Sequence, residues 1–324
     1  MYKYIVTVFF LIAAVSLNFV FAQTANFPAR PIKIIVSTPP GSGGDIIGRA
    51  IAQGLSELTK QQVFVENRIG AGGIIGALAI ANSAPDGYTL GIAVTSHVVA
   101  PLMQKKPAYD PIKDFTAISQ ITTIPNLVIA SGKSNIKTLP ELIAQAKMKS
   151  EELNFGSLGD GTAAHLAAEI LNRATGIKAT HIPYRTIADS YTGLWAGDVL
   201  YLVYLVPSGL PAAQDGKAKI LATTGKTRSA VLPDTPTVRE LGFPTAESEM
   251  TIGLIGPAKI PLPIVQKIHN DITEVLKMPD VRERLLKQGG LPSPDISSKQ
   301  YAERLAQEYE DYKRLISTIG LVQQ

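Results

Sequence analysis

The sequence has no cysteine among its 324 residues, few aromatic residues and only four histidines. Without cysteine, disulfides, thiolate nucleophiles and cysteine-based metal sites are excluded. The formal net charge is only +4 and the basic residues are dispersed, so we expect no binding to nucleic acid. The histidines form no metal-ligand motif, and we therefore expect neither a metal nor a cofactor; they are His97, His165, His181 and His269.

Long apolar runs are also scarce, and the one present lies at the N-terminus, at residues 5–22. Lys3 precedes it, and the small residue Ala22 stands before Gln23. This order predicts a secretory signal peptide, residues 1–22, cleaved near Ala22. The run is also long enough for a short membrane span, so an uncleaved anchor is the alternative. The mature chain of about 300 residues is suited to two domains.

Residues 32–50 are predicted to form a strand, a glycine-rich loop and a helix. Apolar residues fill positions 32–36, and they recur at helical spacing from Ile46 onward. Glycines let a ligand approach the backbone, and a helix start carries free N–H donors and partial positive charge. Such a loop can hold an anion, although a plain strand-to-helix connection is the alternative. Its candidate ligand-binding residues are Thr38, Pro39, Gly41, Ser42, Gly43, Gly44 and Asp45.

Two nucleotide-binding motifs fail at this loop. A P-loop ends in Gly-Lys-Ser/Thr, whereas Gly44 is followed by Asp45 and Ile46. The dinucleotide-binding motif needs a third glycine at the position of Ile46. The loop is therefore predicted to hold a small anion, such as a carboxylate or a phosphate, without a nucleotide.

A second glycine-rich loop repeats this arrangement at residues 154–162. A short strand leads into the loop, and a helix is predicted over residues 163–174, with Thr162 as its N-cap and Gly176 just past its end. His165 lies in the first turn of that helix, where it either faces the ligand or packs. The candidate ligand-binding residues here are Ser157, Gly159, Asp160, Gly161, Thr162 and His165.

Strands and helices alternate along most of the chain, which predicts an α/β fold with a mainly parallel sheet. Ligands of such sheets bind beyond the carboxyl ends of strands. Thr95, Ser96 and His97 follow the predicted strand 90–94 and are further candidates for ligand binding.

The middle and C-terminal parts of the chain are predicted as follows. Strand-like residues 116–129 are broken at Pro125, where we place the first crossing between domains, and residues 251–255 form the return strand. Strands are predicted at 199–206 and 218–224, with a short helix at 238–241. The amphipathic helices 262–278 and 300–319 are expected to pack on the core, as is Trp195.

Several motifs in this order resemble Bug-type extracytoplasmic solute receptors of tripartite tricarboxylate transporter systems. The resemblance spans nearly the whole mature chain. It is carried by FPARPI at 27–32, VENR at 65–68, GAGG at 70–73, PDGYTL at 85–90, YDP at 109–111 and DF at 114–115. It continues with GS at 156–157, HL at 165–166, PY at 183–184, LPD at 232–234 and PT at 236–237.

The resemblance implies a type II periplasmic-binding-protein fold, in which two α/β lobes close on a ligand. Lobe 1 would comprise residues 23–125 and 251–324, and lobe 2 residues 126–250. The resemblance also implies a periplasmic monomer without a cofactor, which captures an organic carboxylate and delivers it to membrane transporter subunits. In the family the carboxylate lies between two loops that match residues 38–45 and 157–162 here.

The chain departs from the family pattern near the cleft. Pro-Phe is usual at Ser37-Thr38, and glycine at Ser42; Lys-Gly-Gly is usual at residues 185–187. Asp is common at Leu200, and Trp at Thr251. These changes leave in place the two loops expected to hold the carboxylate, and they alter the end of the pocket that receives the rest of the ligand. Candidate contacts at that end are Tyr184, Arg185 and Tyr204, of which Arg185 and Tyr204 are equally compatible with packing or surface roles.

Two other classes of function remain as alternatives. An enzyme acting on a carboxylate needs a nucleophile–base pair or paired carboxylates facing the cleft. The sequence has no Gly-x-Ser-x-Gly elbow, and Asp45 and Asp160 in the loops would oppose an anionic substrate. We therefore do not expect an enzyme. A sensory subunit that presents its ligand to a signalling receptor would have the same sequence features as a transport receptor.

Overall fold

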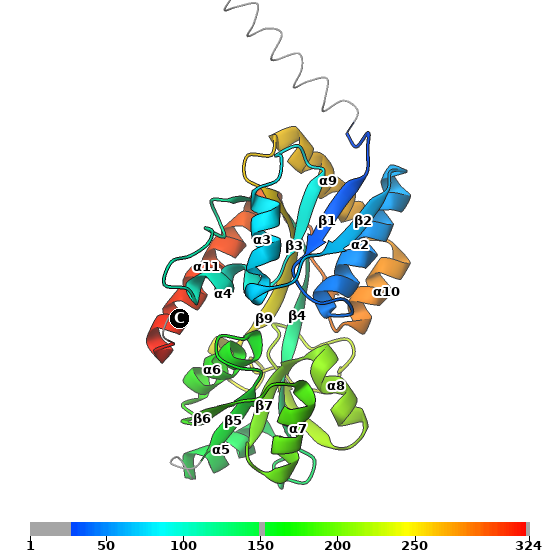
Figure 1. Ribbon diagram of the computed structural model, residues 1–324. Helices are drawn as coiled ribbons and strands as arrows, with labels where there is room; N and C mark the ends of the chain where they lie inside the picture. The colour runs from blue at the N-terminus through cyan, green and yellow to red at the C-terminus, as the bar shows by residue number, and fades with distance from the viewer. Residues whose placement is uncertain (1–26, 149–152, 322–324) are drawn as a thin grey trace, which may run out of the picture.

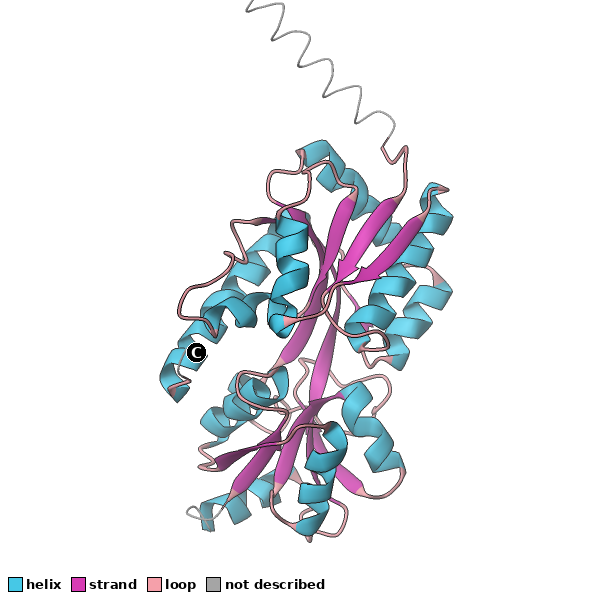
Figure 2. Ribbon diagram, in the orientation of Figure 1, coloured by secondary structure: helices cyan, strands magenta, loops and turns pink. Residues whose placement is uncertain are grey.

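The computed structural model describes residues 27–148 and 153–321, which form two α/β lobes joined by long strands (Figure 1). Ten strands form one connected sheet, eight of them along a continuous path, and helices cover the sheet in each lobe (Figure 2). The predicted signal peptide, residues 1–22, lies outside the described residues. Among the described helices, none is long and apolar enough to cross a membrane.

The sheet of lobe 1 is parallel at one edge and antiparallel at the other. Its strand order is β2-β1-β3-β9-β4, with the short β10 beside β4. The first three strands run parallel, whereas β9 is antiparallel to both β3 and β4. The strands are β1 (Ile32–Val36), β2 (Val63–Asn67), β3 (Thr89–Ala93), β4 (Phe115–Ser131), β9 (Glu249–Pro257) and β10 (Leu291–Pro292).

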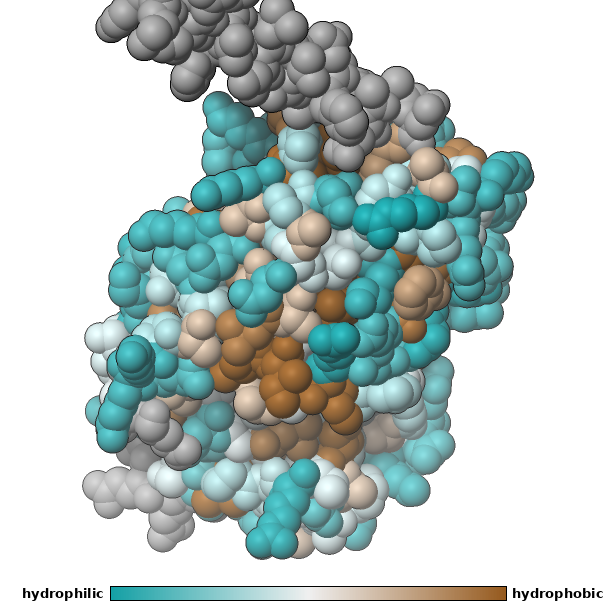
Figure 3. Space-filling model, turned by 45° about the horizontal axis from the view of Figure 1, so that its top comes forward, coloured by the Kyte–Doolittle hydropathy of each residue, from teal (hydrophilic) through white to brown (hydrophobic). Residues whose placement is uncertain are grey.

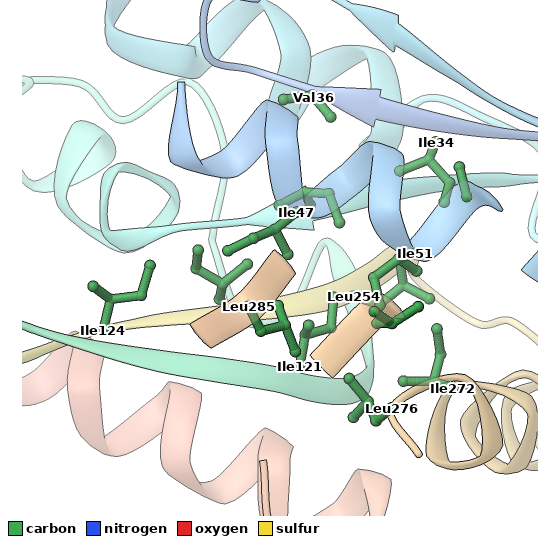
Figure 4. Close-up of a cluster of buried hydrophobic side chains, with 14 of the residues drawn as sticks. Ile34, Val36, Ile47, Ile51, Ile121, Ile124, Leu254, Ile272, Leu276 and Leu285 are labelled. Carbon is green, nitrogen blue, oxygen red and sulfur yellow. The ribbon is translucent and has the colours of Figure 1, made fainter. Parts of the chain in front are cut away.

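Two groups of helices cover the two faces of this sheet. Alternation along β1 places Ile34 in the apolar cluster of one face and Ile35 in that of the other. The first face carries α2 (Gly43–Thr59), α9 (Leu262–Val275) and α10 (Pro279–Lys287), and Figure 4 shows isoleucines and leucines from these helices interlocking with the strands. The second face carries α3 (Ile74–Ala81), α4 (Thr95–Leu102) and α11 (Ser298–Ile319), with the 3₁₀ turn η1 (Ala71–Gly73) before α3.

Strand β4 crosses from one lobe to the other without a break, contrary to the prediction that Pro125 interrupts it. Pro125 pairs with Glu249 of β9, and the next residue, Asn126, pairs with Leu205 of the lobe 2 strand β7 (Tyr201–Leu205). The strand changes its pairing partner at this point, so a proline, which has no N–H group to donate, is tolerated here. The N–H of the next residue, Asn126, donates to a side chain, Thr224 Oγ1, at 2.9 Å. This switch supports our division of the lobes at residues 125 and 251, which stays a proposal.

Lobe 2 repeats the strand–helix alternation around the second half of β4. Its sheet order is β6-β5-β7-β4-β8, in which β5, β6 and β7 are parallel and β4 is antiparallel to β7 and β8. The strands are β5 (Asn154–Ser157), β6 (Thr180–Pro183), β7 (Tyr201–Leu205) and β8 (Ala218–Thr223). The helices are α5 (Leu139–Met148), α6 (Ala163–Thr175), α7 (Ile187–Ala196) and α8 (Val206–Gln214), with the 3₁₀ turn η2 (Pro244–Ala246).

Three local predictions were wrong or incomplete. The helix α8 was missed because Pro207, Gly209 and Pro211 lie within it, and these residues disfavour helices. The helix α10 was also missed. The short helix predicted at 238–241 is a turn, closed by backbone bonds that include one from the Leu241 N–H to the Thr237 carbonyl.

An apolar cluster joins the lobes on the side of α4 and α11. Leu166 of α6, in lobe 2, is fully buried in the same cluster as Val98 of α4 and Leu315 and Ile316 of α11. The lobes therefore contact each other through packed side chains as well as through β4 and β9.

Candidate functional site

The first glycine-rich loop is braced from within. Ser42 caps α2, because its Oγ accepts from the Asp45 N–H and donates to Thr38 Oγ1 at 2.7 Å. The buried carboxylate of Asp45 accepts from the Gly41 N–H at 2.9 Å, from Asn67 Nδ2 at 2.7 Å and from Arg49. Burial raises the pKa of Asp45, but these hydrogen bonds and the Arg49 charge outweigh it and lower the pKa overall. Asp45 therefore holds the loop in shape, and its contact with a ligand stays a prediction.

The first turn of α2 leaves two N–H groups without an acceptor among the described residues. The Ile46 N–H donates to the Ser42 carbonyl at 2.9 Å, and the Asp45 N–H to Ser42 Oγ. The N–H groups of Gly43 and Gly44 precede them and point away from the helix, as first-turn donors do. Together with the positive end of the helix dipole, they form a seat for an anion.

This seat opens into a cavity of about 840 Å³ between the lobes. Its volume lies within the range of small-molecule sites. One side is formed by lobe 1 and the crossing strands, through Thr38, Gly41, Ser42, Gly43, Gly44, Ile46, Val94, Ile124, Met250 and Gln288. The other is formed by lobe 2, through Ile187, Tyr191, Trp195, Leu205, Pro207, Ser208, Pro211, Ala212, Asp215 and Lys217.

Helices α7 and α8 supply most of the lobe 2 wall. Ile187, Tyr191 and Trp195 are four residues apart along α7 and therefore share one face. Trp195 is partly buried. It packs against the apolar core, as expected, and it also lines the cavity, which was not expected. Sequence reasoning missed α8 altogether, and the spacing along α7 was the signal that would have found the first half of this wall.

The second glycine-rich loop is not part of the cavity lining. The Gly161 N–H donates to His165 Nδ1 at 3.1 Å, and the Gly159 N–H to Ser157 Oγ at 3.1 Å, so both are already used. A side chain on Gly161 would collide with Met103 of lobe 1, 2.8 Å away. Thr162 caps α6 as predicted, with its side chain accepting from the His165 N–H. In this arrangement the loop packs against lobe 1, and its contact with ligand stays a prediction.

The family model for the tripartite tricarboxylate transporter family receptor matches residues 47–321. The chain belongs to this receptor family. The UPF0065 protein in the gbd 5′ region of Cupriavidus necator is 35% identical over 300 residues, covering 93% of this chain and 90% of that protein. The resemblance to Bug-type receptors is thereby confirmed, and the protein is a solute-binding receptor. Receptors of this family are periplasmic.

Solved structures agree with the two-lobed fold of the receptor. MatC from Rhodopseudomonas palustris, with bound malate, has a TM-score of 0.73 and 29% identity, covering 90% of this chain and 100% of that one. Rpa4515 from R. palustris, with adipate, has a TM-score of 0.77 and 27% identity, covering 91% and 98%. The predicted fold class, a type II periplasmic-binding-protein fold, is confirmed.

A pair of histidines supports the second loop of the receptor. The rings of His165 and His181 stack with centroids 3.9 Å apart, and His181 Nδ1 lies 3.0 Å from Asp160 Oδ1. Burial, followed by the nearby His181, lowers the pKa of His165 to about 4, so the ring is neutral at pH 7 and accepts from Gly161. The atoms of Asp160, His165 and His181 that could coordinate a metal ion lie within 4.8 Å of one another. The lone pairs of stacked rings lie in parallel planes and do not converge on one point, and His165 Nδ1 already accepts from the Gly161 N–H. The three residues therefore fit a structural support of the loop better than a metal site.

The three candidates after β3 lie at the start of α4 and do not line the cavity. His97 is buried between Tyr109 and Phe115, and its Nε2 donates to the Pro111 carbonyl at 3.0 Å. Burial lowers the pKa of His97 to about 4. Thr95 is buried as well, and Ser96 borders a small internal gap beside His97. A structural role in lobe 1 accounts for these contacts.

The remaining candidates also lie outside the lining of the cavity. Tyr204 is 2% exposed, and its hydroxyl donates to Ser190 Oγ at 2.8 Å, behind the cavity-lining Tyr191. Tyr184 packs on Gly193 of α7, and Arg185 is exposed. Pro39 is exposed beside the first loop. The residues of the predicted set that line the cavity are Thr38, Gly41, Ser42, Gly43 and Gly44.

Proposed function

We propose that this receptor captures a small organic carboxylate in the interlobe cavity, with the carboxylate on the N–H groups of Gly43 and Gly44. The observation that carries the proposal is a helix start with two unused N–H donors opening into a cavity of about 840 Å³. Carboxylate ligands are present in the structures of the related MatC and Rpa4515, which supports the same ligand chemistry here. The second loop approaches the bound anion only if the lobes rearrange.

The magnitudes favour such a site. A helix start stabilises an anion by typically 0.3–1 kcal/mol, and by up to about 2 kcal/mol when partly buried. Hydrogen bonds to a charged acceptor add roughly 1.5–3 kcal/mol each. These contributions are large enough to favour a carboxylate over an uncharged group at this helix start.

We further propose that the chain is exported with a signal peptide cleaved near Ala22 and works as a periplasmic monomer without a catalytic role. It delivers its ligand to the membrane subunits of a tripartite tricarboxylate transporter. Mass spectrometry of the mature protein should find Gln23 at the N-terminus. Copurification with a signalling receptor in place of the transporter subunits would favour the sensory alternative.

Gly43 offers a clean test of the carboxylate seat. A Cβ at this position meets no atom closer than Gln288 Oε1 at 3.9 Å, so a side chain fits. Gly43→Asp places a negative charge where the carboxylate binds, and acidic residues are tolerated at helix starts. Like charges in a desolvated site cost several kcal/mol. We expect the affinity for the best-binding organic acid, measured by calorimetry, to fall a hundredfold or more.

The matched control is Gly43→Asn, which has the same size and no charge. It should lose much less affinity, and both variants should melt close to the parent temperature. If Gly43→Asp folds and binds the acid as tightly as the parent does, the carboxylate is not at this helix start.

A further inference from the structure

We propose that the ligand is a monocarboxylate with an apolar body, and that the wall formed by α7 and α8 selects it against dicarboxylates. This inference rests on the proposed function, because it takes the carboxylate seat at Gly43 and Gly44 as given. It concerns the opposite end of the cavity, which receives the rest of the ligand.

The lobe 2 wall of the cavity is formed mainly by apolar side chains. Ile187, Tyr191 and Trp195 form a continuous stripe along α7, and prolines of α8 lie beside them. Figure 3 shows apolar residues gathered in the middle of the molecule, between the upper and lower lobes. Apolar surface of this kind favours a ligand body that also loses contact with water on binding.

The two aromatic donors of this wall, on Trp195 and Tyr191, are already used within the protein. Trp195 Nε1 donates to the Lys217 carbonyl at 2.9 Å, and the Tyr191 hydroxyl to the Ser208 carbonyl at 3.1 Å. The two rings lie 5.8 Å apart at an interplanar angle of 28°. These bonds fix both rings and leave their carbon surfaces, and not their donors, for the ligand. A rigid aromatic surface suits an aromatic or aliphatic body.

The charges at this end cancel. Among the described residues that line the cavity, the charged ones are Asp215 and Lys217, whose side-chain charges lie 3.6 Å apart. Both side chains are more than half exposed, so their charges are screened by water. A second ligand carboxylate would lose hydration beside apolar side chains and would meet Asp215 together with Lys217. Such a group is costly to bury without a dedicated partner.

Hexanoate and adipate form a matched pair of probes, because both have six carbons and differ in the terminal carboxylate. We expect calorimetry to show hexanoate and phenylacetate binding at least tenfold more tightly than adipate. Adipate that binds as tightly as hexanoate, or more tightly, overturns the proposal.

A charge placed on the wall should reverse this selectivity. Ile187 is 38% exposed at the start of α7, so Ile187→Arg is compatible with folding. It supplies a cation for the second carboxylate, and we expect the ratio of adipate to hexanoate affinity to rise at least tenfold. Leu262→Arg, on α9 outside the cavity lining and 64% exposed, carries the same charge change and should leave the ratio unaltered. An unaltered ratio in folded Ile187→Arg contradicts the proposal.

Trp195 provides an independent test of the aromatic surface. Trp195→Ala should weaken phenylacetate about tenfold or more, while Trp195→Phe, which keeps a ring, should retain most of the affinity. Circular dichroism shows whether each variant is folded. Equal binding of phenylacetate to folded Trp195→Ala and to the parent would remove Trp195 from the site.

The experiments distinguish failure of the proposed selectivity from failure of the proposed function. If no organic acid binds, or if Gly43→Asp has no effect on binding, the proposed function fails and this inference fails with it. If binding depends on Gly43 but adipate is preferred, the carboxylate seat stands and the selectivity proposed for the α7–α8 wall is wrong.

Discussion

At the scale of single residues, the glycines of the two loops have different tasks. Gly161 has a φ of 70° and lies against Met103, so any side chain there strains the loop, whatever its charge. Gly43 has room for a side chain and lines the cavity. A substitution at Gly161 therefore tests the fold of the loop, whereas one at Gly43 tests the ligand.

Two buried histidines make stability depend on pH. The pKa values of His97 and His165 are about 4 in the folded protein, against an ordinary value of 6.5. Between pH 6.5 and 4 the unfolded chain binds protons at these two histidines that the folded protein does not bind, so their contribution to stability falls as the pH falls through this window. Burial raises the pKa of Glu308 to about 7, so this carboxyl contributes with the opposite sign. Each histidine should lower the unfolding free energy at pH 5 by about 2 kcal/mol relative to pH 7. Urea unfolding of the parent and of a histidine variant, each at the two pH values, measures this difference.

A variant separates the contribution of one histidine from the acidic groups. His165→Gln keeps an acceptor for the Gly161 N–H and cannot take up a proton, so it should remove part of the loss between pH 7 and pH 5. A loss as large as that of the parent would mean that His165 is not held neutral in the folded protein.

At the scale of elements, the helix caps decide where helices start. Among the described helices, five begin at a Ser or Thr whose side chain accepts from a backbone N–H in the first turn, namely α2, α5, α6, α7 and α11. Two of them, α2 and α7, begin at the cavity, so the caps also set where free N–H donors and cavity-lining side chains lie.

The capping box of α11 provides an element-scale test. Ser297 Oγ accepts from the Gln300 N–H, and Gln300 Oε1 accepts from the Ser297 N–H at 2.9 Å. Ser297→Ala removes the side-chain half of the box and should lower the unfolding free energy by about 1 kcal/mol. Thr318→Ala, near the other end of α11, removes an exposed hydroxyl and is the control. Equal urea midpoints for both variants would show that the cap adds no stability.

At the scale of the whole molecule, β4 and β9 connect the lobes and an apolar cluster around Leu166 adds contact on one side. Two strands form a narrow connection, and the cavity lies between the bodies they join. This arrangement is typical of hinge closure around a ligand.

Closure should be visible in solution. Small-angle X-ray scattering with saturating hexanoate should give a smaller radius of gyration than the free protein gives. Gly43→Asp, which should not bind the acid, is the control and should keep the larger radius. An unchanged profile at proven saturation would argue against closure, or would mean that the free protein is already closed.

The sequence by itself determined the parts of the receptor that depend on local chemistry. The strand, glycine loop and helix at 32–50 follow from apolar spacing and from Ser42 as a cap, and the helix after Thr162 follows in the same way. The order of motifs indicated the family and thereby the two-lobed fold. These features are readable because neighbouring residues along the chain fix backbone dihedral angles and free N–H groups.

Tertiary structure decided which side chains meet. His97, His165 and Tyr204 have residue types common in binding sites, yet each is buried and hydrogen-bonded within its own lobe. Trp195, expected in the core, lines the cavity because β7 and α8 bring Lys217 to its indole N–H from 22 residues away. The face that a helix turns to a cleft depends on long-range packing against the sheet, and local sequence spacing carries no information about the opposite lobe.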